Sequence, residues 1–210
     1  MSRQHARFDP TALGAGLVLE RSGTVLTYDS ALSINRTARS TEPKTRGRWT
    51  AEWLIWGDAS IDDAVSVGLV RVDASLATYV GGDVYGYGYR PAEGQIHHNG
   101  SSIETVDTCG KTQYIGILFD ANELTATWAI DGDPIVTIEL DAGAYALGAT
   151  ISGATGFDLR ILQNTGQRGI ERPFPATRGW LARRESQGVI RIAETFHHLR
   201  HRPPAEHGGP

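Results

Sequence analysis

The sequence predicts an all-β protein, an antiparallel β-sandwich followed by a C-terminal amphipathic helix or arm. Glycine supplies 25 of the 210 residues, about 12% against an average near 7%, which is typical of a chain with many turns. Several short segments alternate apolar and polar residues with the period of a β-strand. These segments follow one another at a spacing of roughly 8–12 residues, as in sandwiches and barrels.

The first 48 residues predict one hairpin between two polar segments. Residues 1–15 are expected to form an N-terminal lead-in that precedes the sandwich. Within 16–36, apolar residues lie on both sides of a turn at 21–23, which predicts a β-hairpin. Residues 37–48 contain a proline and a glycine among polar side chains, so we expect a loop there.

The next segment, 49–57, predicts a long strand with a core-forming face. Trp49, Ala51, Trp53 and Ile55 alternate with other residues and therefore point to one side. The other segments that we expect to contain strands are 65–72, 79–100, 114–120, 124–130, 134–140, 145–152 and 157–164, with a hairpin turn at 131–133. This assignment places the sandwich domain at 16–181, before a C-terminal helix and flexible tail at 182–210.

The C-terminal segment carries an apolar stripe with helical spacing. The residues that we expect to bind a partner are Val189, Ile192, Phe196, Leu199 and Arg200. Ala193 continues the stripe, and the helix is expected to end before Pro203. Such a helix would pack on its own sandwich or on a neighbouring subunit, and the sequence leaves both arrangements open.

Charge and composition exclude several classes of function. The net charge is −4, but the segment from Arg168 onward has eight arginines and four glutamates, a net of +4, which leaves −8 for the rest. An acidic body argues against broad binding to nucleic acid. No apolar run is long enough to insert into a membrane, and the first residues lack a secretory signal. The single cysteine, Cys109, excludes disulfide frameworks and cysteine-based zinc sites.

The aromatic residues are the strongest candidates for ligand binding, because tyrosine and tryptophan give large amphipathic contacts at low entropic cost. Tyr85, Tyr87 and Tyr89 alternate, so we expect them to share one face of a strand, which either binds ligand or packs on the core. The full set of candidate ligand-binding residues is Trp56, Tyr79, Tyr85, Tyr87, Tyr89 and His98.

No pattern predicts catalysis, a metal site or a cofactor. Asp120, Asp131 and the other prominent carboxylates lie at expected turns, where aspartate caps backbone N–H groups. His97 and His98 are adjacent on an expected strand, so they point to opposite faces, and we expect one to be buried and one solvated. We therefore expect a protein that is not an enzyme.

Six sequence words, in order, resemble the SPRY domain, the core of the B30.2 family. The matching words are RWTAEW (48–53), VSVGLV (65–70), GGDVYGYGY followed by GQIHHNG (81–100), CGKTQYIGILFDANELTATWAIDGDPI (109–135), YALGATISG (145–153) and QNTGQRGIERPFP (163–175). The sequence departs from the family pattern at Lys111, Thr112, Asp131, Ala146 and Thr165.

The resemblance implies a concanavalin-like jelly-roll of two antiparallel sheets that binds partners through loops and carries no catalytic machinery. Similar domains occur in phage tail and surface proteins. The short N-terminal opening FDP…GAGLVL, the low lysine content and the appended helix resemble that phage setting more than a eukaryotic ligase module. Our leading hypothesis is a recognition or assembly component of a virion, made in the bacterial cytoplasm, with other particle subunits or further copies of itself as partners and a cell-surface glycan as ligand. The alternatives are an intracellular peptide-binding adaptor and a glycan-cleaving enzyme on a sandwich fold.

Overall fold

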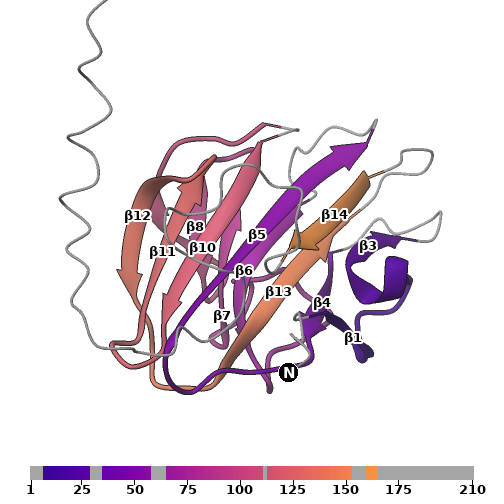
Figure 1. The fold of residues 1–210 in the computed structure, drawn as a ribbon, viewed down its shortest axis with the longest axis horizontal. Helices are drawn as coiled ribbons and strands as arrows, with labels where there is room; N and C mark the ends of the chain where they lie inside the picture. Colours follow the sequence, from indigo (N-terminus) through magenta and orange to yellow (C-terminus); the bar gives the residue numbers. More distant parts are fainter. Residues whose placement is uncertain (1–6, 29–34, 58–64, 111–112, 153–158, 165–210) are drawn as a thin grey trace, which may run out of the picture.

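Two seven-stranded antiparallel sheets lie face to face in the computed structural model, which describes residues 7–28, 35–57, 65–110, 113–152 and 159–164 (Figure 1). Sheet A consists, in spatial order, of β1 (Phe8–Leu13), β4 (Arg36–Ser40), β13 (Tyr145–Ile151), β6 (Val65–Arg71), β7 (Gly86–Arg90), β8 (Gln95–His98) and β9 (Ser101–Thr105). Sheet B consists of β12 (Asp133–Glu139), β11 (Thr125–Ile130), β10 (Tyr114–Asp120), β5 (Arg48–Gly57), β14 (Leu159–Asn164), β3 (Val25–Tyr28) and β2 (Leu17–Glu20), with the short 3-10 turn η1 (Arg21–Gly23) joining β2 to β3. The predicted all-β antiparallel sandwich is confirmed.

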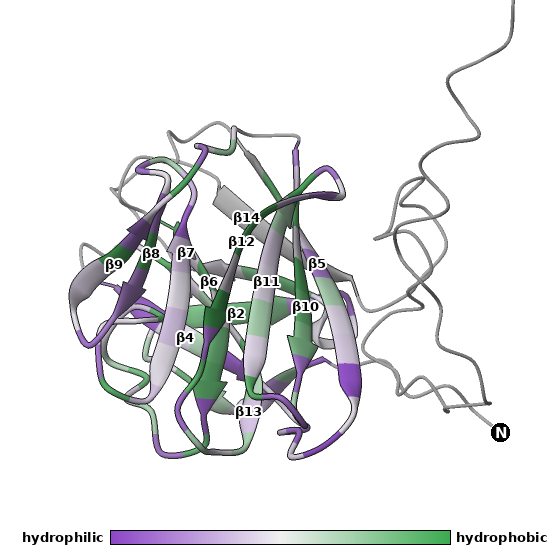
Figure 2. Ribbon diagram, turned by 90° about the vertical axis from the view of Figure 1, so that its left-hand side faces the viewer, coloured by the Kyte–Doolittle hydropathy of each residue, from purple (hydrophilic) through white to green (hydrophobic). Residues whose placement is uncertain are grey.

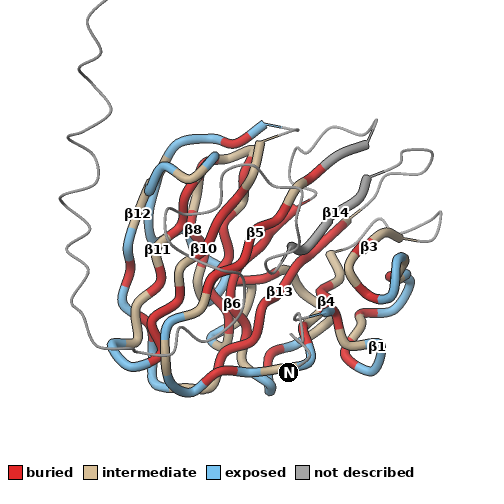
Figure 3. Tube along the Cα trace, viewed as in Figure 1, coloured by how far each residue is buried: buried red, intermediate tan, exposed pale blue. Residues whose placement is uncertain are grey.

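The core lies between the sheets and follows the predicted alternation. Ala51, Trp53 and Ile55 of β5 are fully buried and point toward sheet A, while Trp49 of the same face is partly buried. Hydrophobic residues concentrate along the strands, and hydrophilic residues are frequent in the connections at both ends (Figure 2). Buried backbone runs along the central strands, whereas the edge strand β12 is largely exposed (Figure 3).

Three strands lie where the sequence predicts none. β1 occupies part of the expected lead-in, because Phe8 and Ala12 are buried and the strand pairs with β4. β4 occupies part of the expected loop at 37–48, and β9 follows the predicted short strands. Polar residues of β4 such as Thr37 are buried, so the hydropathy of this segment conceals its position in the sheet.

The predicted C-terminal helix and tail lie outside the described residues. This applies to the candidate partner-binding residues Val189, Ile192, Phe196, Leu199 and Arg200, and to the expected sandwich boundary at 181.

Candidate functional site

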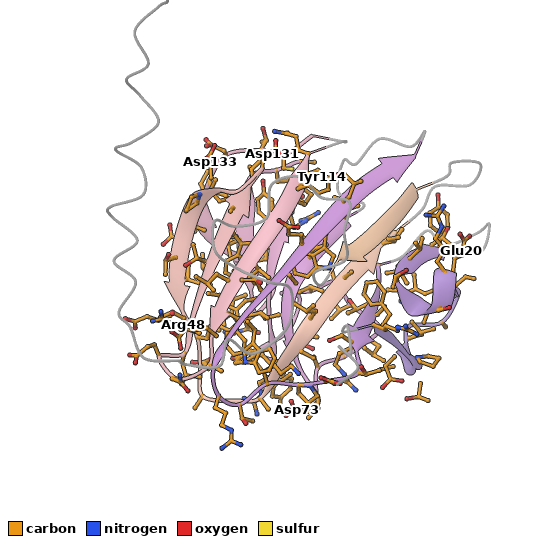
Figure 4. The ribbon with its side chains drawn as sticks, in the orientation of Figure 1. Glu20, Arg48, Asp73, Tyr114, Asp131 and Asp133 are labelled. Atoms are coloured by element: carbon orange, nitrogen blue, oxygen red, sulfur yellow. The ribbon has the colours of Figure 1, made fainter. Side chains whose placement is uncertain are left out.

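The connections between strands gather at two opposite ends of the sandwich. Arg48 and Asp73 lie at one end, and Tyr114, Asp131 and Asp133 lie at the other (Figure 4). The first end carries the 72–85 segment, which links β6 to β7 and is the longest connection that the structure describes completely. This segment determines the surface described below.

A row of buried hydroxyl groups fixes the 72–85 segment across the outer face of sheet A. Ser66 donates a hydrogen bond to the carbonyl oxygen of Val80 at 2.7 Å, and the Val80 N–H donates to Thr150 Oγ1 at 2.8 Å. Thr37 donates to the carbonyl oxygen of Thr78 at 2.6 Å, so the 2.7 Å contact between Thr37 and Thr150 has Thr150 as its donor. These three hydroxyls therefore have satisfied partners although all are buried.

The backbone carbonyls of the same segment are also occupied. Two of these carbonyl oxygens accept from β4 or its start: that of Leu76 from the Thr37 N–H, and that of Ala77 from the Arg36 guanidinium. Two others accept from the β8–β9 turn: that of Gly81 from the Gly100 N–H, and that of Asp83 from the Asn99 N–H. The Asp83 carboxylate in turn accepts the N–H groups of Ser75 and Tyr85. Most of these bonds come from the sheet or from the β8–β9 turn, so the segment is attached to the sheet at several points along its length.

Close approach of the segment to the sheet requires glycine at two positions. A Cβ on Gly88 would lie 1.8 Å from the Val80 carbonyl oxygen, and one on Gly81 would lie 2.4 Å from the His97 carbonyl oxygen. Gly81 also has φ +92, a conformation that favours glycine. In the YGYGY segment (85–89), Gly88 therefore allows the backbone of Val80 to lie directly against β7.

An exposed surface forms where the 72–85 segment begins and ends. The Arg71 N–H donates to the Tyr85 carbonyl oxygen at 2.8 Å, and the Arg71 guanidinium lies 5.1 Å from the Tyr85 ring centroid. Val72 and Val84 flank this hydrogen bond and are 53% and 44% exposed. We call this region the end surface, and it consists of Arg71, Val72, Val84, Tyr85, His98 and Asp141.

His98 and Asp141 complete the end surface. The His98 ring stacks on Tyr87 with centroids 4.1 Å apart, and its Nδ1 lies 3.0 Å from the Gly86 carbonyl oxygen. Its Nε2 is 3.7 Å from the exposed Asp141 carboxylate. The Asp141 N–H donates to the Tyr87 hydroxyl, so the buried Tyr87 positions both neighbours from below.

Tyr79 belongs to a different cluster, on the outer face of sheet A. Its hydroxyl lies 3.2 Å from His97 Nδ1, and the guanidinium of Arg90 lies 5.2 Å from its ring centroid. His97 Nε2 contacts Gln95 at 2.9 Å and lies 3.6 Å from the Glu93 carboxylate. Burial, and secondarily the charge of Arg90, lower the pKa of His97, which favours the neutral ring. The cluster ties the 72–85 segment to β7 and β8.

The candidate ligand-binding residues therefore do not form one face. Tyr87 and Tyr89 are buried in the core, so the expectation that these rings present a ligand-binding surface is wrong, and the alternative that they pack on the core is correct. Tyr85 lies in a turn and packs beside Val70 on the opposite side of sheet A from Tyr87, so the expected shared face is also wrong. Trp56 belongs to β5, but its side chain lies outside what the structure describes. His97 and His98 point to opposite faces and His97 is buried, as predicted, but His98 is largely covered by its stacking on Tyr87 and is not solvated as expected.

The predicted turn aspartates serve the backbone. Asp120 accepts the N–H groups of Asn122 and Glu123 and pairs with Arg48, and Asp131 accepts the Tyr114 N–H. In the described part of the chain, no three His, Cys, Asp or Glu side chains are grouped to hold a metal ion. The described segments also contain no helix of the length and apolar character needed to span a membrane.

Sequence reasoning missed most of the end surface. Val72 and Val84 gave a usable signal, because they are apolar residues within a segment rich in turn formers. Arg71 and Asp141 gave none, since Arg71 reaches the Ala142 carbonyl oxygen, next to Asp141, only through the pairing of β6 with β13.

Comparison with known proteins identifies the fold. No protein-family model matches the chain, and no curated protein sequence does. Among solved structures, the SPRY domain of human HERC1 matches with a TM-score of 0.64 and 17% identity over 74% of this chain and 96% of that one. The TRIM65 PSpry domain matches with a TM-score of 0.60 and 13% identity, over 77% and 92% of the two chains.

A third match is a human SPRY domain, with a TM-score of 0.57 and 16% identity over 70% of this chain and 94% of that one. The chain has a SPRY fold. The resemblance seen in the sequence is thereby confirmed at the level of the fold. In this SPRY fold, the end surface lies at the loop-bearing end defined by Arg48 and Asp73.

Proposed function

We propose that this SPRY-fold chain is a non-enzymatic recognition domain that binds a segment of a partner protein at the end surface. One observation carries the proposal: Val72 and Val84 are exposed apolar side chains on a segment whose backbone is fixed to the sheet. A rigid scaffold with exposed apolar residues beside an arginine and an aromatic ring suits protein recognition, because little conformational entropy is lost on binding.

The surroundings of the aromatic rings favour a peptide over a sugar. Sugar binding commonly uses an open aromatic face, but Arg71 lies over Tyr85, and His98 stacks on Tyr87. Peptide side chains can instead pack on the two valines and pair with Asp141 at the rim. The non-enzymatic part of the proposal is supported by Asp120, Asp131 and Asp83, each of which accepts backbone N–H groups at a turn.

The test is selection of peptides from a displayed random library against the full chain. Peptides enriched by the natural chain should bind the Val84→Asp variant at least tenfold more weakly, about 1.4 kcal/mol. Val18→Asp is the matched control, because Val18 is 40% exposed on the edge strand β2 of the other sheet. Absence of enriched peptides, or equal binding to the Val84→Asp variant, would overturn the proposal.

A narrower form of the proposal places this domain on a phage-type particle, with other particle subunits or further copies as partners and a host-cell glycan as ligand. It is supported by the sequence resemblance to phage SPRY-like domains and by the basic C-terminal segment that follows the sandwich. Tail or capsid genes beside its own gene, and binding on a glycan array, are the expected results. Neighbouring genes of another kind and a blank array would overturn the narrower form while leaving peptide recognition intact.

A further inference from the structure

The end surface combines an apolar centre with acidic groups at its margin. Val72 and Val84 supply the apolar centre, and the side chains of Asp73 and Asp141 are 47% and 66% exposed beside them. Arg71 lies 3.4 Å from Asp73 and 3.4 Å from the Ala142 carbonyl oxygen, which occupies part of its donor capacity. Arg39 donates to the Val72 carbonyl oxygen, so two arginines already lie on the Asp73 side of the surface. An occupant that fits this surface therefore needs apolar side chains for the valines and one cation for Asp141.

The C-terminal segment of this chain has that composition. Its apolar stripe consists of Val189, Ile192, Phe196 and Leu199. At 100° per residue Arg200 lies beside this stripe, whereas Arg191 lies on the opposite face. The segment from Arg168 onward has a net charge of +4, against −8 for the preceding residues. The apolar stripe therefore complements the two valines, and Arg200 complements Asp141.

The course of the chain makes an intramolecular contact available. β14 runs antiparallel to β5, with Leu159 opposite Gly57 and Asn164 opposite Glu52. The chain therefore leaves β14 in the direction of Arg48, at the end of the sandwich that carries the end surface. Residues 165–188 supply 24 residues of connection, enough to span up to about 80 Å. Because the segment and the surface belong to one chain, their effective concentration exceeds that of a free peptide in dilute solution.

We infer that residues 189–200 occupy the end surface of their own chain, with the apolar stripe on Val72 and Val84 and Arg200 beside Asp141. This inference rests on the proposed function, since it names the ligand that a recognition surface meets first. External partners then compete with the tethered segment. Their apparent Kd equals the intrinsic Kd divided by the fraction of chains whose end surface is free.

Paramagnetic relaxation in the full chain tests the contact. His198→Cys carries a nitroxide, because position 198 faces away from the stripe at 100° per residue. The native Cys109 is buried and burial raises its pKa to about 12, so it should remain unlabelled near pH 7. We expect broadening of the amide signals of residues 72, 73, 84, 85 and 141, while residues 92–94 at the opposite end keep their intensity.

Two controls define the interpretation. Phe196→Asp in the labelled chain should restore the signals, whereas Gln187→Asp, which adds the same charge away from the stripe, should leave them broadened. In a dilute mixture where nitroxide and ¹⁵N are on different molecules, the signals should stay sharp. Unbroadened end-surface signals in the doubly labelled chain, or broadening in the mixture, would overturn the inference.

The peptide selection separates failure of this inference from failure of the proposed function. If the tethered segment docks, Phe196→Asp should increase the affinity of selected peptides severalfold, and Gln187→Asp should not. Peptides that bind equally to both variants, together with sharp end-surface signals, overturn the inference and leave the recognition function standing. Broadened signals without any selected peptide overturn the proposed external ligand and leave the intramolecular contact standing.

Discussion

Glu52 gives the structure a stability that depends on pH in an unusual direction. It lies in the middle of β5, opposite Gly116 of β10 and Asn164 of β14, on the side of sheet B that faces away from the core. The residue is only 7% exposed, and desolvation by burial raises its pKa from 4.5 to about 7. A buried carboxylate lacks the hydration that stabilises its charge, so the folded state favours the protonated form.

The magnitude follows from the difference between the folded and unfolded pKa values. Below pH 4.5 both states hold the proton, and Glu52 carries no penalty. Between 4.5 and 7 the unfolded chain releases the proton while the folded chain keeps it, so unfolding becomes progressively easier. Above pH 7 the folded state carries the buried charge, and the accumulated loss is about 3 kcal/mol at 1.36 kcal/mol per pKa unit.

Glu52→Gln isolates this contribution, because glutamine has nearly the same shape and no charge. Urea denaturation from pH 4 to pH 9 should show the variant becoming more stable relative to the natural protein as pH rises, by about 3 kcal/mol above pH 7. Glu139→Gln on the exposed edge strand β12 is the control and should leave the stability profile unchanged. A difference between natural protein and Glu52→Gln that is constant across pH would refute the reasoning.

Three further substitutions or reactions test the packing described above. Gly88→Ala should cost about 3 kcal/mol in urea denaturation, because the added Cβ meets a backbone carbonyl oxygen at 1.8 Å, whereas Gly110→Ala, whose nearest neighbouring atom is at 3.5 Å, should change little. Thr150→Val should cost about 1–3 kcal/mol in the same assay, because it removes the acceptor of a buried N–H. Thr137→Val on exposed β12 is its control and should be nearly neutral. Burial raises the pKa of Cys109 from 9.0 to about 12, so alkylation at pH 8 should be slower by on the order of a thousandfold in folded than in urea-unfolded protein.

Each result has an outcome that contradicts it. Equal stability of Gly88→Ala and Gly110→Ala would mean that the 72–85 segment does not lie against β7. A neutral Thr150→Val would mean that water reaches the Val80 N–H and replaces the lost acceptor. If Cys109 in the folded protein were alkylated at the same rate as a small-molecule thiol, its thiol would be exposed.

The sequence predicts strands well where apolar residues alternate. β5 was expected at 49–57 and lies at Arg48–Gly57, while β10 has the expected bounds. The turn between β11 and β12 was expected from Asp131 and Gly132, and both residues have positive φ, 51° and 90°. In these segments local side-chain chemistry and the tertiary environment favour the same conformation.

Alternation indicates which residues share a face, but it does not indicate which face is buried. Tyr87 and Tyr89 share a face as expected, yet that face is the core. Tyr85 does not share this face, because β7 begins at Gly86 and Tyr85 therefore precedes the strand. Only the register with β6, where Tyr87 lies opposite Leu69, assigns the rings to the interior.

The end surface could not be predicted from the sequence, because the residues that hold the 72–85 segment in place are distant from one another in the chain. Thr37 and Thr150 are 113 residues apart, and their hydroxyls meet only after β4 and β13 have paired. Polar residues at 37–40 favour a loop when hydropathy alone is considered. Their burial becomes favourable because the crossing 72–85 segment supplies hydrogen-bond partners such as the Thr78 carbonyl oxygen.

The groups that attach the 72–85 segment to the sheet are different from the side chains that we expect to bind a partner. The sheet holds the 72–85 segment through backbone carbonyls and through Thr37, Ser66 and Thr150, and none of these contacts uses the side chain of Val72 or Val84. Backbone attachment is insensitive to side-chain identity, so the exposed residues at both ends of the segment are free to differ without loss of the fold. For this reason the Val84→Asp variant is expected to lose ligand and keep its stability, whereas Gly88→Ala is expected to lose stability first.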